Sequence, residues 1–142
     1  MAGNNPVTTS TGTGKIRLPS GKIRETALRI YSGERIPLQR RTNLVCCSDF
    51  IIRRLNRQYR NIDTATDVLS FPFNDSDFLG EIYISLRRTE VQARRFGHPF
   101  NDEFLRLFVH GMLHLAGYDH LQQDDQKKMN RKENRYLQKN LY

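Results

Sequence analysis

Long apolar runs are absent from this 142-residue chain. No run approaches the roughly 18 apolar residues that a membrane-spanning helix needs, so we expect no such helix. The first residues also lack a positively charged region followed by an apolar stretch, so a secretory signal is not expected. Together these absences favour a cytoplasmic protein.

Cysteine is scarce, with only Cys46 and Cys47, which are adjacent. A disulfide between the two is disfavoured because the backbone holds neighbouring Cβ vectors apart. They follow Leu44 and Val45, so we expect buried strand residues in a reducing cytosol. The alternative is a thiol metal site or a redox pair.

Basic residues are missing from residues 61–86, which hold five acidic residues, although the whole chain has a net charge of +8. Residues 1–60 hold twelve basic against three acidic residues, and residues 87–142 hold eleven against seven. This excess favours a polyanionic partner such as nucleic acid, with an acidic protein as the alternative. Residues 1–14 carry no charge and predict a disordered tail before a single domain over residues 15–142.

Hydrophobic periodicity predicts an α+β fold in which a small mixed β-sheet packs against helices. The helical and strand patterns do not alternate strictly, which argues against a repeated βαβ arrangement. The expected strands cover residues 15–18, 43–47, 68–73 and 81–85. The expected helices cover residues 23–31, 48–59, 86–96, 102–116 and 122–141.

Three of the four histidines fall within eleven residues, at His110, His114 and His120. The first two are four apart on a predicted helix, so their rings project from one face, a turn apart. Gly117 can end that helix in a left-handed conformation and return His120 to the same point. Three protein ligands with an open fourth position are typical of a catalytic zinc site, so we predict one Zn²⁺ per chain, or another divalent transition metal, at this helix end.

The spacing of these histidines matches the metzincin protease pattern at every position but one. That pattern has a general-base glutamate where this chain has Gly111. Peptide hydrolysis by that mechanism therefore lacks its proton acceptor. The metal ligands are kept, whereas the protease chemistry is not supported.

Several motifs resemble those of the YbeY family of ribosomal-RNA-processing endoribonucleases. The matching segments are LNRQYR at residues 55–60, Asp63, TDVLSFP at residues 66–72, LGEI at residues 79–82 and HGMLHLAGYDH at residues 110–120. The resemblance implies an α+β fold and a metal, usually zinc, on the three histidines. It also implies cleavage of single-stranded RNA, maturation of small-subunit rRNA at its 3′ end, and ribosome quality control. The partners implied are rRNA and the small ribosomal subunit with its assembly factors.

Arg60 matches the functionally important arginine of that family, which makes it the predicted catalytic contact to substrate or transition state. Its guanidinium can offer a planar, bidentate fork to a phosphate. Tyr59 and Tyr118 are candidates for stacking on bases, and Asp119 is a candidate base or partner of a ligand imidazole. Two other functions stay open: a metal-dependent hydrolase of another class, such as a peptidase, and a non-catalytic ribosome-binding factor with a structural metal.

Overall fold

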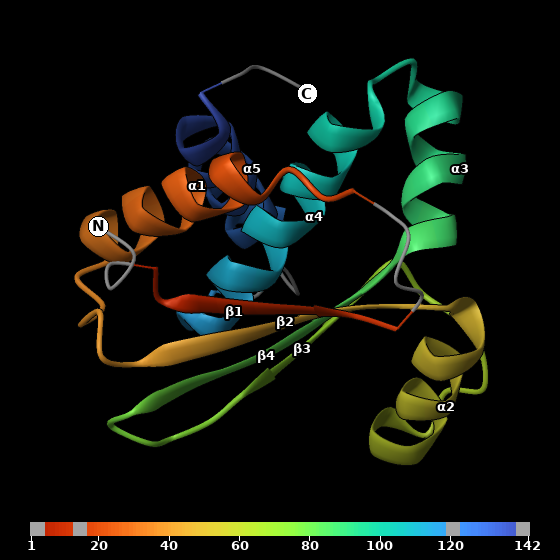
Figure 1. Ribbon diagram of the computed structural model, residues 1–142, viewed down its shortest axis with the longest axis horizontal. Coiled ribbons are helices and arrows are strands. Elements are labelled where there is room, and N and C mark those ends of the chain that lie inside the picture. Colours follow the sequence, from red (N-terminus) through yellow and green to blue (C-terminus); the bar gives the residue numbers. More distant parts are fainter. Residues whose placement is uncertain (1–4, 13–16, 119–122, 139–142) are drawn as a thin grey trace.

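The computed structural model describes residues 5–12, 17–118 and 123–138, and its elements form an α+β fold (Figure 1). This confirms the fold class predicted from the sequence. In chain order the elements are β1 (Val7–Thr11), α1 (Ser20–Gly33), β2 (Arg41–Cys47), α2 (Asp49–Arg60), β3 (Val68–Pro72), β4 (Phe78–Ser85), α3 (Leu86–Phe96), α4 (Phe100–Leu115) and α5 (Gln123–Leu137). Among these residues no helix is long and apolar enough to cross a membrane.

The four strands form one mixed sheet in the order β1-β2-β4-β3. β1 and β4 both run parallel to β2, while β3 pairs antiparallel with β4 across a loop of residues 73–77. Side chains alternate between the two faces of such a sheet. In β4 this places Ile82 and Ile84 on one face and Tyr83 on the other.

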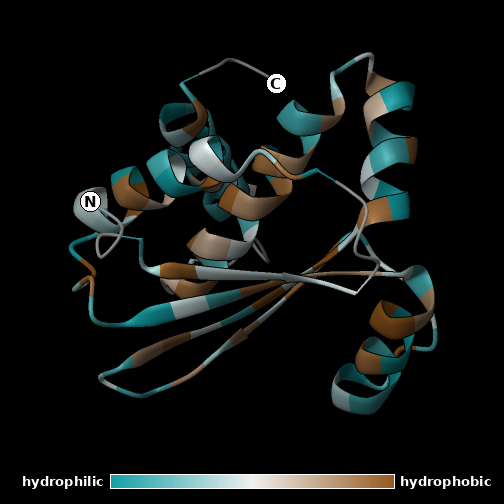
Figure 2. Cartoon of the chain, in the orientation of Figure 1, coloured by the Kyte–Doolittle hydropathy of each residue, from teal (hydrophilic) through white to brown (hydrophobic). Residues whose placement is uncertain are grey.

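Helices cover the two faces of the sheet unequally. α1, α4 and α5 lie together over one face, whereas α2 lies on the opposite face (Figure 1). α4 is enclosed by the sheet, α1, α3 and α5, and ten of its sixteen residues are buried. Hydrophobic residues accordingly gather on α4 and on the strands that it covers (Figure 2).

Local sequence explains where α2 and α3 begin and end. The Ser48 hydroxyl caps α2 by accepting a hydrogen bond from the Ile51 amide, at 3.3 Å. The Ser85 hydroxyl caps α3 in the same way and also donates to Asp49, at 2.6 Å. Gly97 then ends α3 with a φ of +71°. These contacts place the start of α2 beside the start of α3.

The prediction of a disordered tail over residues 1–14 is wrong for Val7–Thr11, which form the edge strand β1. Val7 is buried, and β1 pairs with β2 along its whole length. The uncharged stretch that suggested a tail is rich in threonine, a β-branched residue that favours strands. The strand expected over residues 15–18 is also wrong where it is described, because Arg17 and Leu18 lie in no strand.

The cysteines lie in β2, as predicted, and both are buried and free. Burial raises the pKa of the Cys46 thiol to about 12. Burial, with Asp49 nearby, raises the pKa of the Cys47 thiol to about 11. Both thiols are therefore protonated at neutral pH, which argues against a thiolate metal site or a redox pair.

One carboxylate connects the end of α1 to α5 and to Tyr118, three residues after the end of α4. Glu34 accepts hydrogen bonds from the Tyr118 hydroxyl at 2.7 Å, the Lys132 ammonium at 3.1 Å, and the Tyr136 hydroxyl. Burial raises the pKa of Glu34, but these three hydrogen bonds together outweigh it, so the pKa lies below its ordinary value. The ionised carboxylate thus holds three parts of the chain together.

We expect Glu34→Gln to lower the free energy of unfolding by about 1–3 kcal/mol near pH 7, because hydrogen bonds to a charged group are lost. A carboxylate whose folded pKa is depressed stabilises the protein above its ordinary pKa, here 4.5, and stops doing so as pH falls through the folded value. The difference from wild type should therefore shrink below about pH 4.5 in urea titrations. Glu25→Gln, an exposed change on the same helix, is the control. Equal stability of the two variants at every pH would contradict this assignment.

Candidate active site

The last two turns of α4 carry His110 and His114 on one side of the helix, as their spacing predicted. The two rings meet edge to face, with centroids 4.7 Å apart. Their Nε2 atoms are 3.1 Å apart. Both nitrogens therefore converge on one point beside the helix.

The separation of these nitrogens fits a shared metal ion. Two ligands that each lie 2.0–2.1 Å from a tetrahedral zinc are about 3.3 Å apart. The observed Nε2–Nε2 distance of 3.1 Å is close to that value without any movement of the helix. Neutral imidazole nitrogens are also ligands that zinc, copper, nickel and iron all accept.

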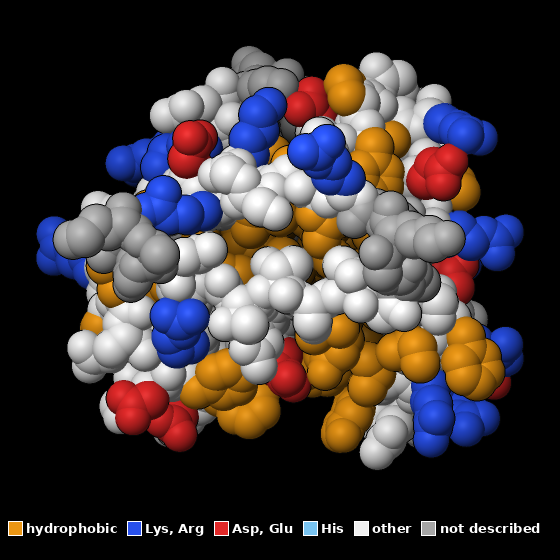
Figure 3. All heavy atoms as spheres, in the orientation of Figure 1, with side chains coloured by type: hydrophobic (Ala, Val, Ile, Leu, Met, Phe, Trp, Pro, Cys, Tyr) orange, Lys and Arg blue, Asp and Glu red, His pale blue; other side chains and the backbone are white. Residues whose placement is uncertain are grey.

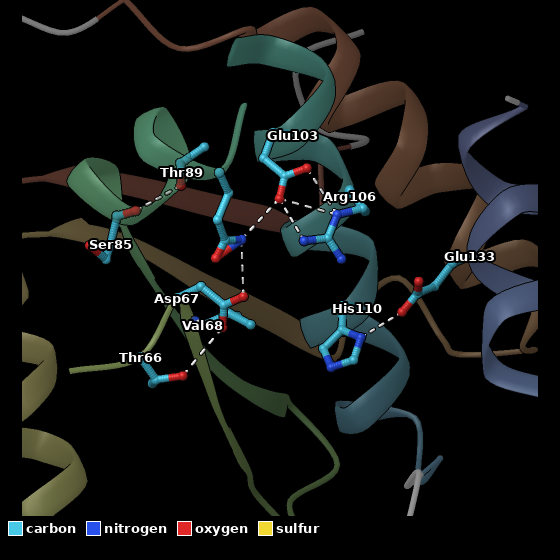
Figure 4. Close-up of polar contacts among 10 residues, drawn as sticks. Thr66, Asp67, Val68, Ser85, Thr89, Glu103, Arg106, His110 and Glu133 are labelled. Carbon is cyan, nitrogen blue, oxygen red and sulfur yellow. Dashed lines mark hydrogen bonds and ion pairs between the residues drawn. The ribbon is translucent and has the colours of Figure 1, made fainter. Parts of the chain in front are cut away.

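A buried carboxylate holds the other nitrogen of His110. Glu133, on α5, lies 2.5 Å from His110 Nδ1 and is only 1% exposed (Figure 4). With Nδ1 donating to Glu133, the lone pair of Nε2 faces the point shared with His114. This is the usual partner of a metal-binding histidine, because it sets both the tautomer and the ring orientation.

The third predicted ligand, His120, lies outside the described residues, as does Asp119. The helix does stop where the sequence predicted: α4 ends at Leu115, and Gly117 has a φ of +104° that favours glycine. Within residues 5–12, 17–118 and 123–138, no three side chains of the metal-binding types come together. The complete three-histidine site therefore stays a prediction.

His110 and His114 open onto a hollow of about 570 Å³. Arg60, at the end of α2, lines the same hollow, although it lies fifty residues before His110 in the sequence. The motif segment that begins at Thr66 forms the facing wall, and Gly117 and Tyr118 close the side next to the end of α4. The structure thus brings together Arg60, two of the three predicted ligands and the motif strand β3.

Two anchors hold the wall that Thr66 and Asp67 form. Asn56 is buried and donates to the Thr64 carbonyl at 2.9 Å, which ties the loop to α2. Asp67 accepts from the Val68 amide at 2.8 Å and from Gln92 at 3.3 Å (Figure 4). Both hydrogen bonds hold Asp67 in place, so its role is to position the wall.

A polar chain continues from Asp67 into the interior. Gln92 also donates to Glu103, at 3.0 Å, and Glu103 is fully buried. Arg106 pairs with Glu103 at 2.5 Å, one turn before His110 (Figure 4). The chain links the wall of the hollow to the helix that carries the histidines.

Sequence reasoning missed Glu133, although a signal was present. On α5 the residues Met129, Glu133 and Tyr136 are spaced by four and three, and all three are buried. A glutamate on the apolar stripe of an otherwise polar helix needs a buried partner. Glu103 occupies a similar position on α4; its partner Arg106 is three residues later on the same helix, whereas Gln92 comes from α3.

The candidate stacking residues lie in different surroundings. Tyr59 is 62% exposed, and its ring meets Phe71 edge to face at 5.4 Å. Tyr118 is partly buried, and its hydroxyl is occupied by Glu34. Of the two, Tyr59 has the freer ring.

Gly111 lies where α4 touches the sheet. A Cβ at this position would come within 2.8 Å of Ile82 Cγ2 and 3.1 Å of Ser70 Oγ. A glutamate, as in the metzincin pattern, would collide with these two side chains unless they or the helix moved. The packing thus gives a physical reason for the glycine and weighs against the peptidase alternative.

Comparison with known proteins decides the family. The sequence model of Endoribonuclease YbeY matches residues 11–140. The chain belongs to the YbeY family. The resemblance read from its motifs is therefore confirmed.

Relatives match over most of the chain. Endoribonuclease YbeY of Desulforamulus reducens is 44% identical over 68% of this chain and 69% of the relative. Endoribonuclease YbeY of Pelotomaculum thermopropionicum is 37% identical over 93% of this chain and 95% of the relative. The solution structure of TM1509 from Thermotoga maritima aligns with a TM-score of 0.65 and 34% identity, covering 93% of this chain and 87% of that one.

We expect Gly111→Ala to lower the free energy of unfolding by up to about 2 kcal/mol, and to leave it about 1–3 kcal/mol below that of Gly21→Ala. Overpacking against the stiff side chain of Ile82 costs about 1–3 kcal/mol, and the helix propensity of alanine returns about 1 kcal/mol. Gly21→Ala is the control, because a Cβ there would meet nothing within 4 Å. Denaturant titration measures both changes, and a Gly111→Ala protein as stable as Gly21→Ala would show that α4 does not depend on this close approach.

Proposed function

We propose that this chain is a metal-dependent endoribonuclease that hydrolyses phosphodiester bonds in single-stranded RNA. The observation that carries the proposal is the hollow shared by Arg60, His110 and His114, in a chain of the YbeY family. The arrangement joins a ligand pair for a cation to a guanidinium suited to a phosphate. The net charge of +8 is consistent with a polyanionic substrate.

His110, His114 and His120 would hold the metal, for which we propose Zn²⁺. When bound, this ion supplies Lewis acidity, which polarises a phosphoryl oxygen and favours ionisation of water near neutral pH. Glu133 orients His110 by accepting the hydrogen from Nδ1. Zinc affinity should therefore depend on α5 as well as on α4.

Arg60 would bind the phosphate and stabilise the negative charge that develops on its oxygens during cleavage. Its position at the exposed end of α2 leaves the guanidinium open to substrate. The side of the hollow formed by residues 66–72 is neutral apart from Asp67, which accepts hydrogen bonds from Val68 and Gln92. On this side of the hollow, the substrate phosphate would thus be bound by the guanidinium of Arg60.

The proposal extends to the biological setting that the family resemblance implies. The RNA would be rRNA, and the reaction would be maturation of the small-subunit rRNA 3′ end, with a part in ribosome quality control. The partners would be the small ribosomal subunit and its assembly factors, in the cytoplasm. The two tests below begin with the isolated protein, because the hollow is formed by this chain alone.

Elemental analysis of purified protein should find about one zinc per chain, and His114→Ala should lose it. Glu133→Gln should fold and bind zinc about 10–100-fold more weakly, because it keeps the shape of the side chain but removes the charge on the partner of His110. Competition with a chromophoric chelator measures these affinities. Glu90→Gln, an exposed change with the same loss of charge, is the control.

Absence of zinc from wild type, with none taken up on addition, would refute the metal site. Equal zinc affinity of wild type and Glu133→Gln would leave the site standing but remove the role given to Glu133.

Arg60→Ala should lower kcat for a single-stranded oligoribonucleotide by about 10²–10³-fold, with zinc content and stability unchanged, since a charge-stabilising donor is lost. Arg60→Lys should recover only part of the rate, because an ammonium lacks the planar fork. Arg95→Ala, at the far end of α3, is the control.

An unchanged kcat in Arg60→Ala would overturn the catalytic role of Arg60. Analysis of the product ends completes this test: a free 3′- or 5′-phosphate agrees with attack by water. A 2′,3′-cyclic phosphate would instead make the RNA 2′-hydroxyl the nucleophile.

A further inference from the structure

α2 presents an outward face that neither the core nor the active site uses. Phe50, Arg53, Arg54 and Arg57 are spaced by three, one and three residues, so they share one side of the helix. The opposite side buries Ile52 against the sheet. We call these four residues the α2 face.

The α2 face combines one large aromatic ring with three guanidinium groups. Phe50 is 72% exposed, the highest value among the large hydrophobic side chains that the structure describes. The four residues and Asp63 line a hollow of about 410 Å³. Figure 3 shows basic and hydrophobic side chains side by side over α2, at the lower right.

The three arginines are not equivalent. Arg53 pairs with Asp63, with Nε and Oδ1 3.0 Å apart and a second bond of 3.3 Å. Arg54 and Arg57, in contrast, form no hydrogen bond or ion pair with any other described residue. Asp63 therefore fixes the position of Arg53, while Arg54 and Arg57 keep their donors for a ligand.

The α2 face is continuous with the proposed active site. Arg60 is one turn beyond Arg57 and lines the hollow that contains His110 and His114. From Phe50 to Arg60 the helix rises about 15 Å, at 1.5 Å per residue. A strand that places one phosphate at Arg60 can therefore run along α2 towards Phe50.

We propose that the α2 face is a binding site for the RNA strand next to the scissile bond, with one base stacked on Phe50 and flanking phosphates at Arg54 and Arg57. This rests on the proposed function and names where its substrate extends. An aromatic ring among guanidinium groups is the usual composition of a site for single strands, because every base offers a face for stacking. A duplex would not present its bases in this way.

Among the described residues, a second exposed group with an aromatic ring beside arginines has partners within the chain. At the end of α3, Phe96 is 55% exposed beside Arg94 and Arg95. Arg94 pairs with Glu90 at 2.8 Å, and the Arg95 guanidinium lies over the Phe96 ring at 5.8 Å. This group also lies at the opposite end of α3 from α2 (Figure 1), so it serves as the matched control.

The test is the affinity for a fluorescein-labelled oligoribonucleotide, measured by anisotropy with a chelator present so that the RNA stays intact. Phe50→Ala should weaken binding about 5–100-fold. The double variant Arg54→Ala with Arg57→Ala should also weaken binding. It should reduce the slope of the logarithm of the binding constant against the logarithm of salt concentration by about 1.4, or about 0.7 per lost phosphate contact. Phe96→Ala and the pair Arg94→Ala with Arg95→Ala should bind as wild type does.

Cleavage provides a second measurement. With the oligonucleotide, the α2 variants should raise KM and leave kcat unchanged, because the reacting phosphate is held elsewhere. With a dinucleotide, which is too short to reach Phe50, they should match wild type in both parameters.

Wild-type affinity in the α2 variants, or an equal loss in the Phe96 and Arg94/Arg95 controls, would overturn the α2 site. Cleavage by wild type would still support the nuclease in that case. A wild-type protein that neither binds nor cleaves RNA would overturn the proposed function, and the α2 site with it.

Discussion

The arrangement of the active-site groups depends on how closely α4 approaches the sheet at Gly111. A hydrogen is all that fits between this residue and Ile82, and the Ser70 hydroxyl donates to the Gly111 carbonyl at 3.2 Å. The helix therefore cannot roll or rise without breaking this contact. The same contact holds α4 against β3. Because His110 is the residue before Gly111, the contact also fixes the direction in which the His110 ring leaves the helix.

Two buried glutamates also hold α4 in position, through contacts with the neighbouring helices α5 and α3. Glu133 reaches His110 from α5, and Glu103 connects the start of α4 to α3 through Gln92. A buried carboxylate without a partner costs several kcal/mol, so each of these contacts also selects one way of docking its helix. Contacts with α3, α5 and the sheet consequently set the position of α4, which carries His110 and His114 into the hollow.

Much of this was readable from the sequence because local chemistry specified it. The cap at Ser48, the stop at Gly97 and the spacing of His110 and His114 predicted helix limits and a shared histidine face. The strand at Val7 was missed because an uncharged, threonine-rich segment resembles a tail until its partner β2 is known. Glu133 was missed for a related reason: its contact spans 23 residues, and a single sequence shows only that a charge interrupts an apolar stripe.

The position of Glu133 in the chain has a consequence for biosynthesis. During translation the sheet, α2 and α4 leave the ribosome before α5, which is the last of the described helices in chain order. A chain that ended before Glu133 would lack the carboxylate that aligns His110, although it would still carry Arg60 and His114. We expect such a chain to bind the proposed metal more weakly, so that truncation within α5 would reduce RNA cleavage without removing any described residue that lines the hollow.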